Sequence, residues 1–353
     1  MDSAAGHRSR HPTWDHKEHP ISRNRAIRPA TPENIRAAAE HLRGGGLVGL
    51  PTETVYGLAA SVWNTSAIAH IFASKDRPLF DPLIVHLAGN GDPLRSLYES
   101  HVVDLSLFQA VAHQTLAALS AHGWPGPLTL ILPRSSGVPD LAAAGLPTIA
   151  VRIPDHPVAE ALLRLTGPLV APSANRFGRI SPTRADDVAD ELGDRVSLIL
   201  DGGPCKVGVE STILSVSPDG SLVLLRPGGT PVAQIEAWVR RTVALPKPFD
   251  KLVAPGQLPG HYAPRTPMML LSNAPARLPA RVGLLRMSPG EGSYTMEHVL
   301  SPTGELVEMA RNLFAGLRAL DDAGLDLILA EMPASDLGLG HAIRDRLTRA
   351  AHR

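Results

Sequence analysis

Cationic side chains near position 75 could bind an anion. Residues 75–86 read KDRPLFDPLIVH, with Lys75 and Arg77 before two prolines and His86 after an apolar run. An arginine offers a planar, two-pronged grip on phosphate or carboxylate, whereas a lysine offers a compact positive charge. The apolar run alone would make a buried strand. The cations and the histidine that flank it therefore favour a binding function.

Three further stretches combine hydroxyl, amide and charged side chains, which bind phosphate, carboxylate and ribose well. They are residues 51–57 (PTETVYG), residues 172–183 (PSANRFGRISPT), and residues 208–212 (GVEST) with 226–229 (RPGG). All four stretches follow or precede predicted strands, and open α/β sheets bind ligands at strand ends. Their coincidence in one region predicts a shared site.

Each feature has a simpler interpretation when it is taken alone. A stretch rich in hydroxyls is more often a turn with a capping side chain. Cations after a helix commonly complement the helix dipole. His86 inside an apolar strand is more often a hydrogen-bonded core residue, and His261 and Tyr262 could pack within a linker. Only the combination of these features favours a functional site over a purely structural role.

The sequence lacks the signatures of several common sites. It contains no GxxxxGKS/T loop, no GxGxxG turn, no HExxH and no CxxC. Cys205 is the only cysteine, which excludes a disulfide framework and a cysteine-rich zinc site and is typical of a reducing compartment. No apolar run reaches the roughly 18–20 residues that a membrane span needs. We therefore expect a cytoplasmic protein that does not enter a membrane.

The composition is typical of a soluble globular protein with more than one domain. The chain has 353 residues, of which 44% are hydrophobic and 19% charged, and its formal net charge is zero. A neutral chain has no general attraction to nucleic acid or to an anionic membrane. Any anion site must therefore arise from local placement of arginine and lysine.

Strand and helix patterns alternate through the first two thirds of the chain. Pro32 after the N-cap candidate Thr31 begins a helix that should end at the glycines 44–46. Further helices are predicted at 66–74, 105–121, 157–165, 184–192 (behind the cap candidate Thr183) and 231–241. Strands are predicted at 47–51, 83–87, 128–132, 148–154, 168–171, 196–203, 209–216 and 222–226. This alternation indicates an α/β fold with a sheet of mixed direction.

Four segments follow from these patterns. Residues 1–24 are predicted to be a flexible tail, and residues 25–244 a catalytic α/β domain. Residues 245–267 are so rich in proline and glycine that we expect a semi-rigid linker. Residues 268–353 form a smaller domain with strands at 281–285 and 325–332, a helix at 306–323, and a basic amphipathic helix at 340–351.

Five ordered motifs resemble those of the YrdC/Sua5 family. They are PTETVYGL, KDRPLFDPLIVH, PSANRFGRISPT, GVESTIL and LRPGG, and the later PGHYAP and GHAIRDRLTRAA are similar to the two-domain Sua5 type. The resemblance covers roughly residues 25–350. It implies a YrdC-like twisted mixed sheet with flanking helices, plus a smaller Rossmann-like α/β C-terminal domain.

The resemblance implies a nucleotidyltransferase that makes L-threonylcarbamoyladenylate and pyrophosphate from L-threonine, bicarbonate or CO₂, and ATP. Downstream transferase proteins would then place the threonylcarbamoyl group on adenosine 37 of tRNA, the t6A modification, and a direct contact with tRNA stays open. Mg²⁺ is expected to accompany ATP, without a metal site made by the protein itself.

This reaction agrees with the residue types. The amine of threonine captures CO₂ as a carbamate, whose oxygen attacks the α-phosphorus of ATP. The attacking group is already an anion, so the site needs no activated side-chain nucleophile. It must instead bring two anions together and stabilise the charge of the leaving pyrophosphate.

The resemblance also implies roles for individual residues. Lys75 and Arg77 would be catalytic. Around threonine it places Thr54, His86, Arg152 and Ser211. On the nucleotide it places Arg77, Asp81, Thr148, Ser173, Asn175, Ser181, Arg226, His261 and Tyr262.

Two positions depart from the family pattern. Asp81 stands where the family commonly has asparagine, and a carboxylate there would repel a phosphate unless it faces Mg²⁺ or pairs with Arg77 or another cation. The linker lacks the basic residues often found just before HYAP. Our hypothesis is that His261 and Tyr262 cover the nucleotide and that the second domain regulates access.

Two other functions remain as alternatives. A non-catalytic module on the same fold could bind double-stranded RNA or tRNA, because a concave basic surface suits an RNA helix. The zero net charge and the complete set of small polar residues argue against it. A carbamoyl-transfer domain of the hydrogenase-maturation kind has a related fold but carries cysteine-paired zinc motifs, which one cysteine excludes.

Overall fold

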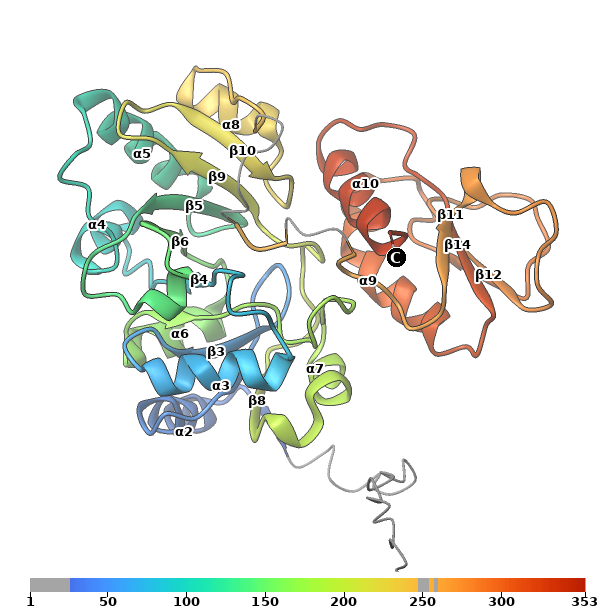
Figure 1. Cartoon of the computed structure of the whole chain (residues 1–353), viewed down its shortest axis with the longest axis horizontal. Coiled ribbons are helices and arrows are strands. Elements are labelled where there is room, and N and C mark those ends of the chain that lie inside the picture. Colours follow the sequence, from blue (N-terminus) through green and yellow to red (C-terminus); the bar gives the residue numbers. More distant parts are fainter. Residues whose placement is uncertain (1–25, 247–253, 257–259, 353) are drawn as a thin grey trace, which may run out of the picture.

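A computed structural model describes residues 26–246, 254–256 and 260–352 of the chain (Figure 1). The predicted tail at 1–24 lies outside the described residues, as does part of the predicted linker. The described part folds around two separate sheets. None of its helices is both long enough and apolar enough to cross a bilayer.

The larger sheet has ten strands of mixed direction in the order β1-β8-β2-β3-β7-β4-β6-β5-β9-β10. Parallel pairs such as β4–β6 and β5–β9 alternate with antiparallel pairs such as β6–β5 and β9–β10. The strands are β1 (Ile27–Pro29), β2 (Val48–Leu50), β3 (Gly57–Ser61), β4 (Ile84–His86), β5 (Leu128–Pro133), β6 (Thr148–Arg152), β7 (Leu169–Val170), β8 (Leu198–Asp201), β9 (Thr212–Val216) and β10 (Leu222–Arg226).

Helices pack on this sheet through apolar faces. They are α2 (Pro32–Arg43), α3 (Thr65–Lys75), α4 (Pro93–Glu99), α5 (Ala110–Gly123), α6 (Pro157–Thr166), α7 (Ala185–Leu192) and α8 (Val232–Val239). Thr31 caps α2 as predicted, because its side chain accepts from the backbone N–H of Asn34. The mixed sheet with flanking helices is therefore confirmed.

Helix α3 sets the start of the cationic stretch. Its buried residues Ile68, Ile71 and Phe72 fix the helix on the sheet, and its last residue is Lys75. The chain then turns at Asp76, which adopts a left-handed conformation with φ of 53°. This turn redirects the chain so that Arg77 begins the loop that leads into β4.

The structure corrects four details of the predicted elements. The helix predicted from residue 105 begins at Ala110. Arg184, not Thr183, is the N-cap of α7, because it is the extended residue directly before Ala185, and the carboxylate of Asp187 accepts from its backbone N–H. Strand β3 was not predicted because its sequence, GLAAS, has only one large apolar residue, Leu58. Helix α4 was missed because Leu97 is its only buried residue.

The smaller sheet has four parallel strands in the order β11-β14-β12-β13. They are β11 (Met268–Leu270), β12 (Val282–Arg286), β13 (Met296–Val299) and β14 (Leu327–Ala330). Two helices, α9 (Leu306–Asp321) and α10 (Leu339–Ala350), lie between this sheet and the larger domain (Figure 1). The predicted Rossmann-like α/β arrangement is confirmed, with β11 and β13 added to the two predicted strands.

The two domains share an apolar contact. Val55, Ile180 and Val209 of the larger domain belong to the same buried cluster as Leu313 and Phe314 of α9. Polar contacts surround it. Arg318 of α9 donates to the carbonyl of Ile180 and pairs with Glu191 at 3.1 Å, and Arg311 donates to the carbonyl of Lys206. The second domain is thus docked on the loops that carry the polar motifs.

Candidate functional site

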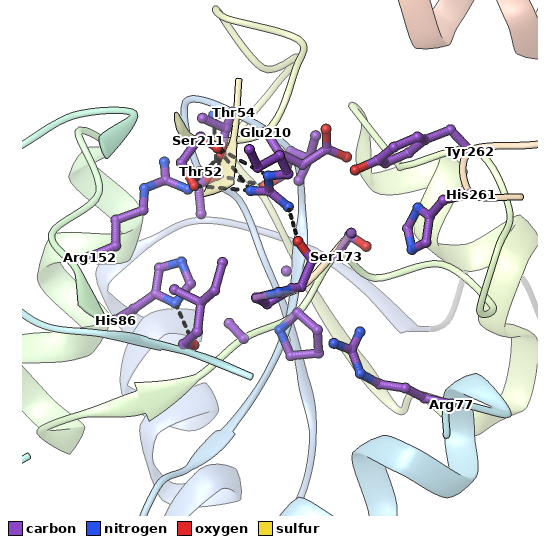
Figure 2. A pocket seen from close by; sticks show the side chains of 18 residues that line it. Thr52, Thr54, Arg77, His86, Arg152, Ser173, Glu210, Ser211, His261 and Tyr262 are labelled. Carbon is purple, nitrogen blue, oxygen red and sulfur yellow. Dashed lines mark hydrogen bonds between the residues drawn. The ribbon is translucent and has the colours of Figure 1, made fainter. Parts of the chain in front are cut away.

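A cavity lies at the strand ends of the larger sheet and reaches the segment that joins the domains (Figure 2). It unites all four polar stretches that the sequence singled out. The predicted site residues that line it are Thr54, Arg77, His86, Arg152, Ser173, Ser211, Arg226, His261 and Tyr262. The predicted residues outside its lining are Lys75, Asp81, Thr148, Asn175 and Ser181.

One side of the cavity, here called the sheet wall, consists of Thr54, His86, Arg152 and Ser211. Strand register aligns His86 with Arg152, and side-chain hydrogen bonds attach the other two residues. His86 ends β4 directly opposite Arg152 at the end of β6, and Arg152 is in turn opposite Thr129 of β5. The Thr129 hydroxyl lies 2.7 Å from that of Ser211. Residues directly opposite on adjacent strands project to the same face, so main-chain pairing aligns His86, Arg152 and Thr129. Thr54 and Ser211 stand in loops and join them through hydrogen bonds to Arg152 and Thr129.

Arg152 is held on several sides. Its guanidinium donates to Thr54 Oγ1 at 2.8 Å and to the carbonyl of Gly126 at 3.2 Å, and its Nη2 lies 2.6 Å from Glu53 Oε2. Arg152 and Glu53 are both buried. The sequence interpretation missed Glu53, although it stands between two residues of the PTET motif. Glu53 therefore balances part of the positive charge of Arg152, which the sequence analysis expected to bind threonine.

His86 is a neutral group in this wall. Burial, and then the charge of Arg152, lower the pKa of His86 to about 3. Its Nδ1 lies 3.2 Å from the carbonyl of Ile84. At neutral pH the imidazole can therefore position a ligand through a hydrogen bond, but it cannot supply a positive charge.

Arg77 faces the cavity from the opposite side in Figure 2 and is fixed by the loop that follows it. Its Nη2 lies 2.9 Å from Asp81 Oδ2, and its guanidinium also donates to the carbonyls of Asp81 and Pro82. Of the alternatives for Asp81, the observed one is the pairing with Arg77. A nucleotide contact of Asp81 stays a prediction.

Lys75 is buried outside the cavity lining and holds the loop that carries Ser173, which does line the cavity. The ammonium donates to the backbone carbonyls of Ser173, at 2.5 Å, and Asn175. Burial, reinforced by the charge of Arg77, lowers the pKa of Lys75 well below its usual range. In this structure Lys75 therefore acts on the Ser173–Asn175 loop, and its direct action on a substrate stays a prediction.

The other predicted residues outside the lining have clear surroundings. Thr148 begins β6, at the other end of the strand from Arg152. The amide nitrogen of Asn175 donates to the carbonyls of Arg176 and Arg179, which closes its own loop. Ser181 donates to a carboxylate that does line the cavity, that of Glu210. Their nucleotide contacts stay predictions.

The second side of the cavity, here called the interdomain wall, consists of Glu210, His261 and Tyr262. The carboxylate of Glu210 accepts from Ser181 Oγ at 2.5 Å and from Arg346 Nε of α10 at 2.7 Å. The ring of His261 lies against Tyr262, and Tyr262 stacks on Phe314 of α9. This wall therefore joins the first domain, the connecting segment and the second domain.

The sequence interpretation missed Glu210 and Arg346. Helix α10 was predicted to be basic and amphipathic, yet its Arg346 is fully buried, at 0% exposure. Burial alone would raise the pKa of Glu210, but the guanidinium groups of Arg346 and Arg226 outweigh it and hold that pKa below its usual range. The sequence contained one signal for such a pair. Glu210 stands in the predicted strand at 209–216, and a glutamate that is buried in a strand requires a cationic partner.

Arg226 connects the strands to the segment between the domains. It ends β10, donates to the carbonyl of Ser211 at 2.9 Å, and donates to the carbonyl of Pro255 at 3.2 Å. Arg226 is buried yet lines the cavity. Arg226 and Arg77 both line the cavity, so two cations are placed to bind an anionic ligand there.

The carboxylates around the cavity do not form a metal site. Each is already paired with an arginine: Asp81 with Arg77, Glu53 with Arg152, and Glu210 with Arg346. Across the described part of the chain, no three acidic, histidine or cysteine side chains gather in a way that could hold an ion. The residues present therefore do not fit a resident Mg²⁺.

Comparisons with known proteins agree with this arrangement. The Sua5–YciO–YrdC family model, described as telomere recombination, matches residues 40–228, and a model described as the C-terminal domain of threonylcarbamoyl-AMP synthase matches residues 230–352. The threonylcarbamoyl-AMP synthase of Bacillus subtilis is 40% identical over 334 residues, which cover 90% of this chain and 92% of the relative. That of Pyrococcus abyssi is 37% identical over 332 residues, covering 90% and 94%.

A solved structure is similar over both domains. The crystal structure of Pyrococcus abyssi Sua5 complexed with L-threonine matches with a TM-score of 0.79 and 35% identity, covering 92% of this chain and 96% of that one. The resemblance inferred from five short motifs is therefore confirmed. The chain belongs to the YrdC/Sua5 family, in its two-domain form.

Proposed function

We propose that this chain is a threonylcarbamoyl-AMP synthase, a nucleotidyltransferase that joins L-threonine, bicarbonate or CO₂, and ATP into L-threonylcarbamoyladenylate and releases pyrophosphate. The observation that carries the proposal is the meeting of the sheet wall with Arg77 and Arg226 in one cavity. Relatives named as threonylcarbamoyl-AMP synthases support it, as does the similar Pyrococcus abyssi protein, which binds L-threonine.

The sheet wall suits an amino acid. The Arg152 guanidinium offers donors to a carboxylate, while the hydroxyls of Thr54 and Ser211 can bond the polar groups of threonine. His86 is neutral, so it does not attract a second anion. Glu53 neutralises part of the Arg152 charge, so threonine binding depends on directed hydrogen bonds more than on net charge.

The chemical step depends on positioning. The carbamate oxygen forms a bond to the α-phosphorus of ATP while the bond from that phosphorus to the pyrophosphate oxygen breaks. Arg77 and Arg226 are placed to stabilise negative charge on the phosphates. Because no side chain in this scheme is a covalent nucleophile, the absence of a cysteine from the cavity lining does not conflict with it.

Mg²⁺ enters the proposal only together with ATP. The carboxylates that line or approach the cavity are paired with arginines, so a magnesium ion would depend on phosphate and water oxygens, which Mg²⁺ favours. The product would be used by downstream transferase proteins that modify tRNA, and a direct tRNA contact of this chain stays an expectation.

The deciding experiment is incubation with ATP, L-threonine and labelled bicarbonate, followed by detection of pyrophosphate and a labelled adenylate. We expect both products, and neither without threonine. ATP breakdown that does not depend on threonine would contradict the proposal, and so would no reaction. Binding of double-stranded RNA without adenylate formation would instead favour the non-catalytic alternative.

Arg77 supplies a matched test of the site. The variant Arg77→Met should lower adenylate formation by well over tenfold, because a positioned charge is lost from the cavity. The control is Arg95→Met, since Arg95 pairs with Glu99 on the exposed surface of α4. The control variant should keep full activity. Full activity of Arg77→Met would refute the assignment.

A further inference from the structure

The buried contact between Arg346 and Glu210 joins the two domains at the cavity. Arg346 belongs to α10 of the second domain and Glu210 to the loop before β9. Nε of Arg346 donates to Glu210 Oε2 at 2.7 Å, and exposure is 0% for Arg346 and 7% for Glu210. Such a pair requires accurate geometry, because removing two charges from water is costly.

Arg346 does more than balance one charge. Its Nη1 donates to Asp345 at 2.5 Å, and its guanidinium carbon lies 5.0 Å from the centre of the Tyr262 ring. A planar guanidinium can bond a carboxylate at one edge while its face covers an aromatic ring. Arg346 therefore fixes the relative position of Glu210 and Tyr262.

Both residues that Arg346 fixes line the cavity. The second oxygen of Glu210 accepts from Ser181, so a chain of hydrogen bonds runs from Arg346 through Glu210 to Ser181. On the other side, Tyr262 contacts the ring of His261. Tyr262 also holds a left-handed backbone conformation, with φ of 66°, which surrounding contacts must maintain.

The polar contact that Arg318 makes between the domains does not reach the cavity. Arg318 of α9 bonds Glu191 and the carbonyl of Ile180, and none of these three residues lines the cavity. Arg346 thus differs from an ordinary docking contact, because both of its interaction partners outside α10 belong to the interdomain wall.

We propose that Arg346 is a positioning residue of the reaction. Helix α10 of the second domain holds the Glu210 carboxylate and the Tyr262 ring, and through Glu210 the Ser181 hydroxyl, in the geometry that receives ATP. This inference rests on the proposed function, in which the cavity binds ATP as well as threonine. The second domain then completes the nucleotide side of the site, whereas the threonine side is complete within the first domain.

The test is Arg346→Met in the full chain, with KM and kcat measured for each substrate and the Kd for ATP measured by calorimetry. We expect the KM and Kd for ATP to rise about tenfold or more, as when a charge-assisted hydrogen bond is lost. The KM for threonine should change less than about threefold. Arg346→Lys should recover part of the ATP affinity, because an ammonium can still pair with Glu210.

A double-mutant cycle shows whether Arg346 acts through Glu210. On a Glu210→Gln background the glutamine oxygen can still accept from Ser181, and no charge is left unpaired. There we expect Arg346→Met to change the ATP affinity less than about threefold, because the partner that it positions has already been altered. An equal effect on both backgrounds would overturn the proposal. The double variant also tests activity where the single variant fails to fold.

Arg318→Met is the matched control for docking alone. It removes an arginine from the same interface without a partner in the cavity, so ATP and threonine constants should both change less than about threefold. If it raised the ATP constants as much as Arg346→Met, or if Arg346→Met raised both substrate constants equally, Arg346 would be only a docking residue.

The proposed function can fail separately. Wild-type chain that binds ATP but forms no adenylate would refute the synthase, while the effect of Arg346→Met on the Kd would still decide the positioning role. Wild-type chain that binds no ATP would refute both.

Discussion

The two walls of the cavity are built in different ways. The sheet wall comes from one domain, where the register of β4, β6 and β5 aligns His86, Arg152 and Thr129. The interdomain wall joins residue 210, residues 261–262 and, behind them, residue 346, which only the docking of two domains brings together. Main-chain pairing aligns the strand residues of the first wall, whereas side-chain contacts between the two domains position the second.

Both walls contain buried polar atoms that have no hydrogen-bond partner among the described residues, although such atoms usually have one. At the sheet wall they are Nη2 of Arg152 and the carboxylate oxygens of Glu53, and Nη2 and Oε2 of these two residues form an ion pair at 2.6 Å. In the interdomain wall they are the Tyr262 hydroxyl and His261 Nδ1, which are neutral groups outside any such pair. The unpartnered atoms of the sheet wall therefore belong largely to one ion pair, whereas those of the interdomain wall are available to a ligand.

The largest effect is expected where the sheet wall is broken. Arg152→Met should raise the KM for threonine by about 100-fold, near the upper effect of losing a charged hydrogen bond. It should also lower the free energy of unfolding by about 3–5 kcal/mol, because Glu53 is left buried and unpaired. Steady-state kinetics and urea denaturation measure the two effects.

A double variant separates these two effects. Glu53→Gln combined with Arg152→Met should recover much of the stability but none of the threonine affinity. If the single variant instead weakened ATP and threonine equally, the two walls would not be independent, and the comparison between them would be wrong.

A smaller effect is expected when Lys75, which holds the Ser173–Asn175 loop, is replaced. Lys75→Met should lower adenylate formation by well over tenfold while the fold survives, since the carbonyls of Ser173 and Asn175 lose their donor. Ser173 lies between the two walls in Figure 2, so kcat should fall more than either KM rises. The measurement is pyrophosphate release at saturating substrates, with circular dichroism to confirm folding. Unchanged turnover would show that neither wall depends on this loop.

The smallest effect is a pH dependence confined to the interdomain wall. The pKa of Glu210 in the folded chain lies below its usual range, so its contribution to stability is present above the unfolded pKa of about 4.3. It is lost as the pH falls through the lower folded pKa. Unfolding of wild type and Glu210→Gln should therefore differ above about pH 4.5 and converge in acid. A constant difference down to pH 2 would mean that the carboxylate is not stabilised by Arg346.

The family and the fold could be predicted from the sequence because both depend on local patterns. Strand and helix periodicity gave most elements, and Thr31, Pro32 and the glycines at 44–46 gave the bounds of α2. Strand β3 could not be predicted in this way, because its mostly small residues are buried by strands and helices from other parts of the chain. Thr54, His86 and Ser211 of the sheet wall could be named because they stand inside recognisable motifs, and Arg152 because it stands in a predicted strand.

Side-chain partners were much less predictable than motifs. The KDRPLFDP stretch suggested two cations facing a ligand, yet Lys75 faces two backbone carbonyls and Arg77 is paired with Asp81. Which partner a charged side chain chooses depends on distances in three dimensions and on burial, and neither is encoded in sequence spacing.

The sequence by itself determined the α/β fold, the family and the residue types of the cavity, because helix and strand periodicity and turn chemistry act over short distances along the chain. Only the tertiary structure decided that Glu53 balances Arg152 and that Arg346 of the last helix pairs with Glu210. The second pair joins positions 136 residues apart. A buried charge must find its partner wherever the folded chain places one, so no local pattern could have revealed it.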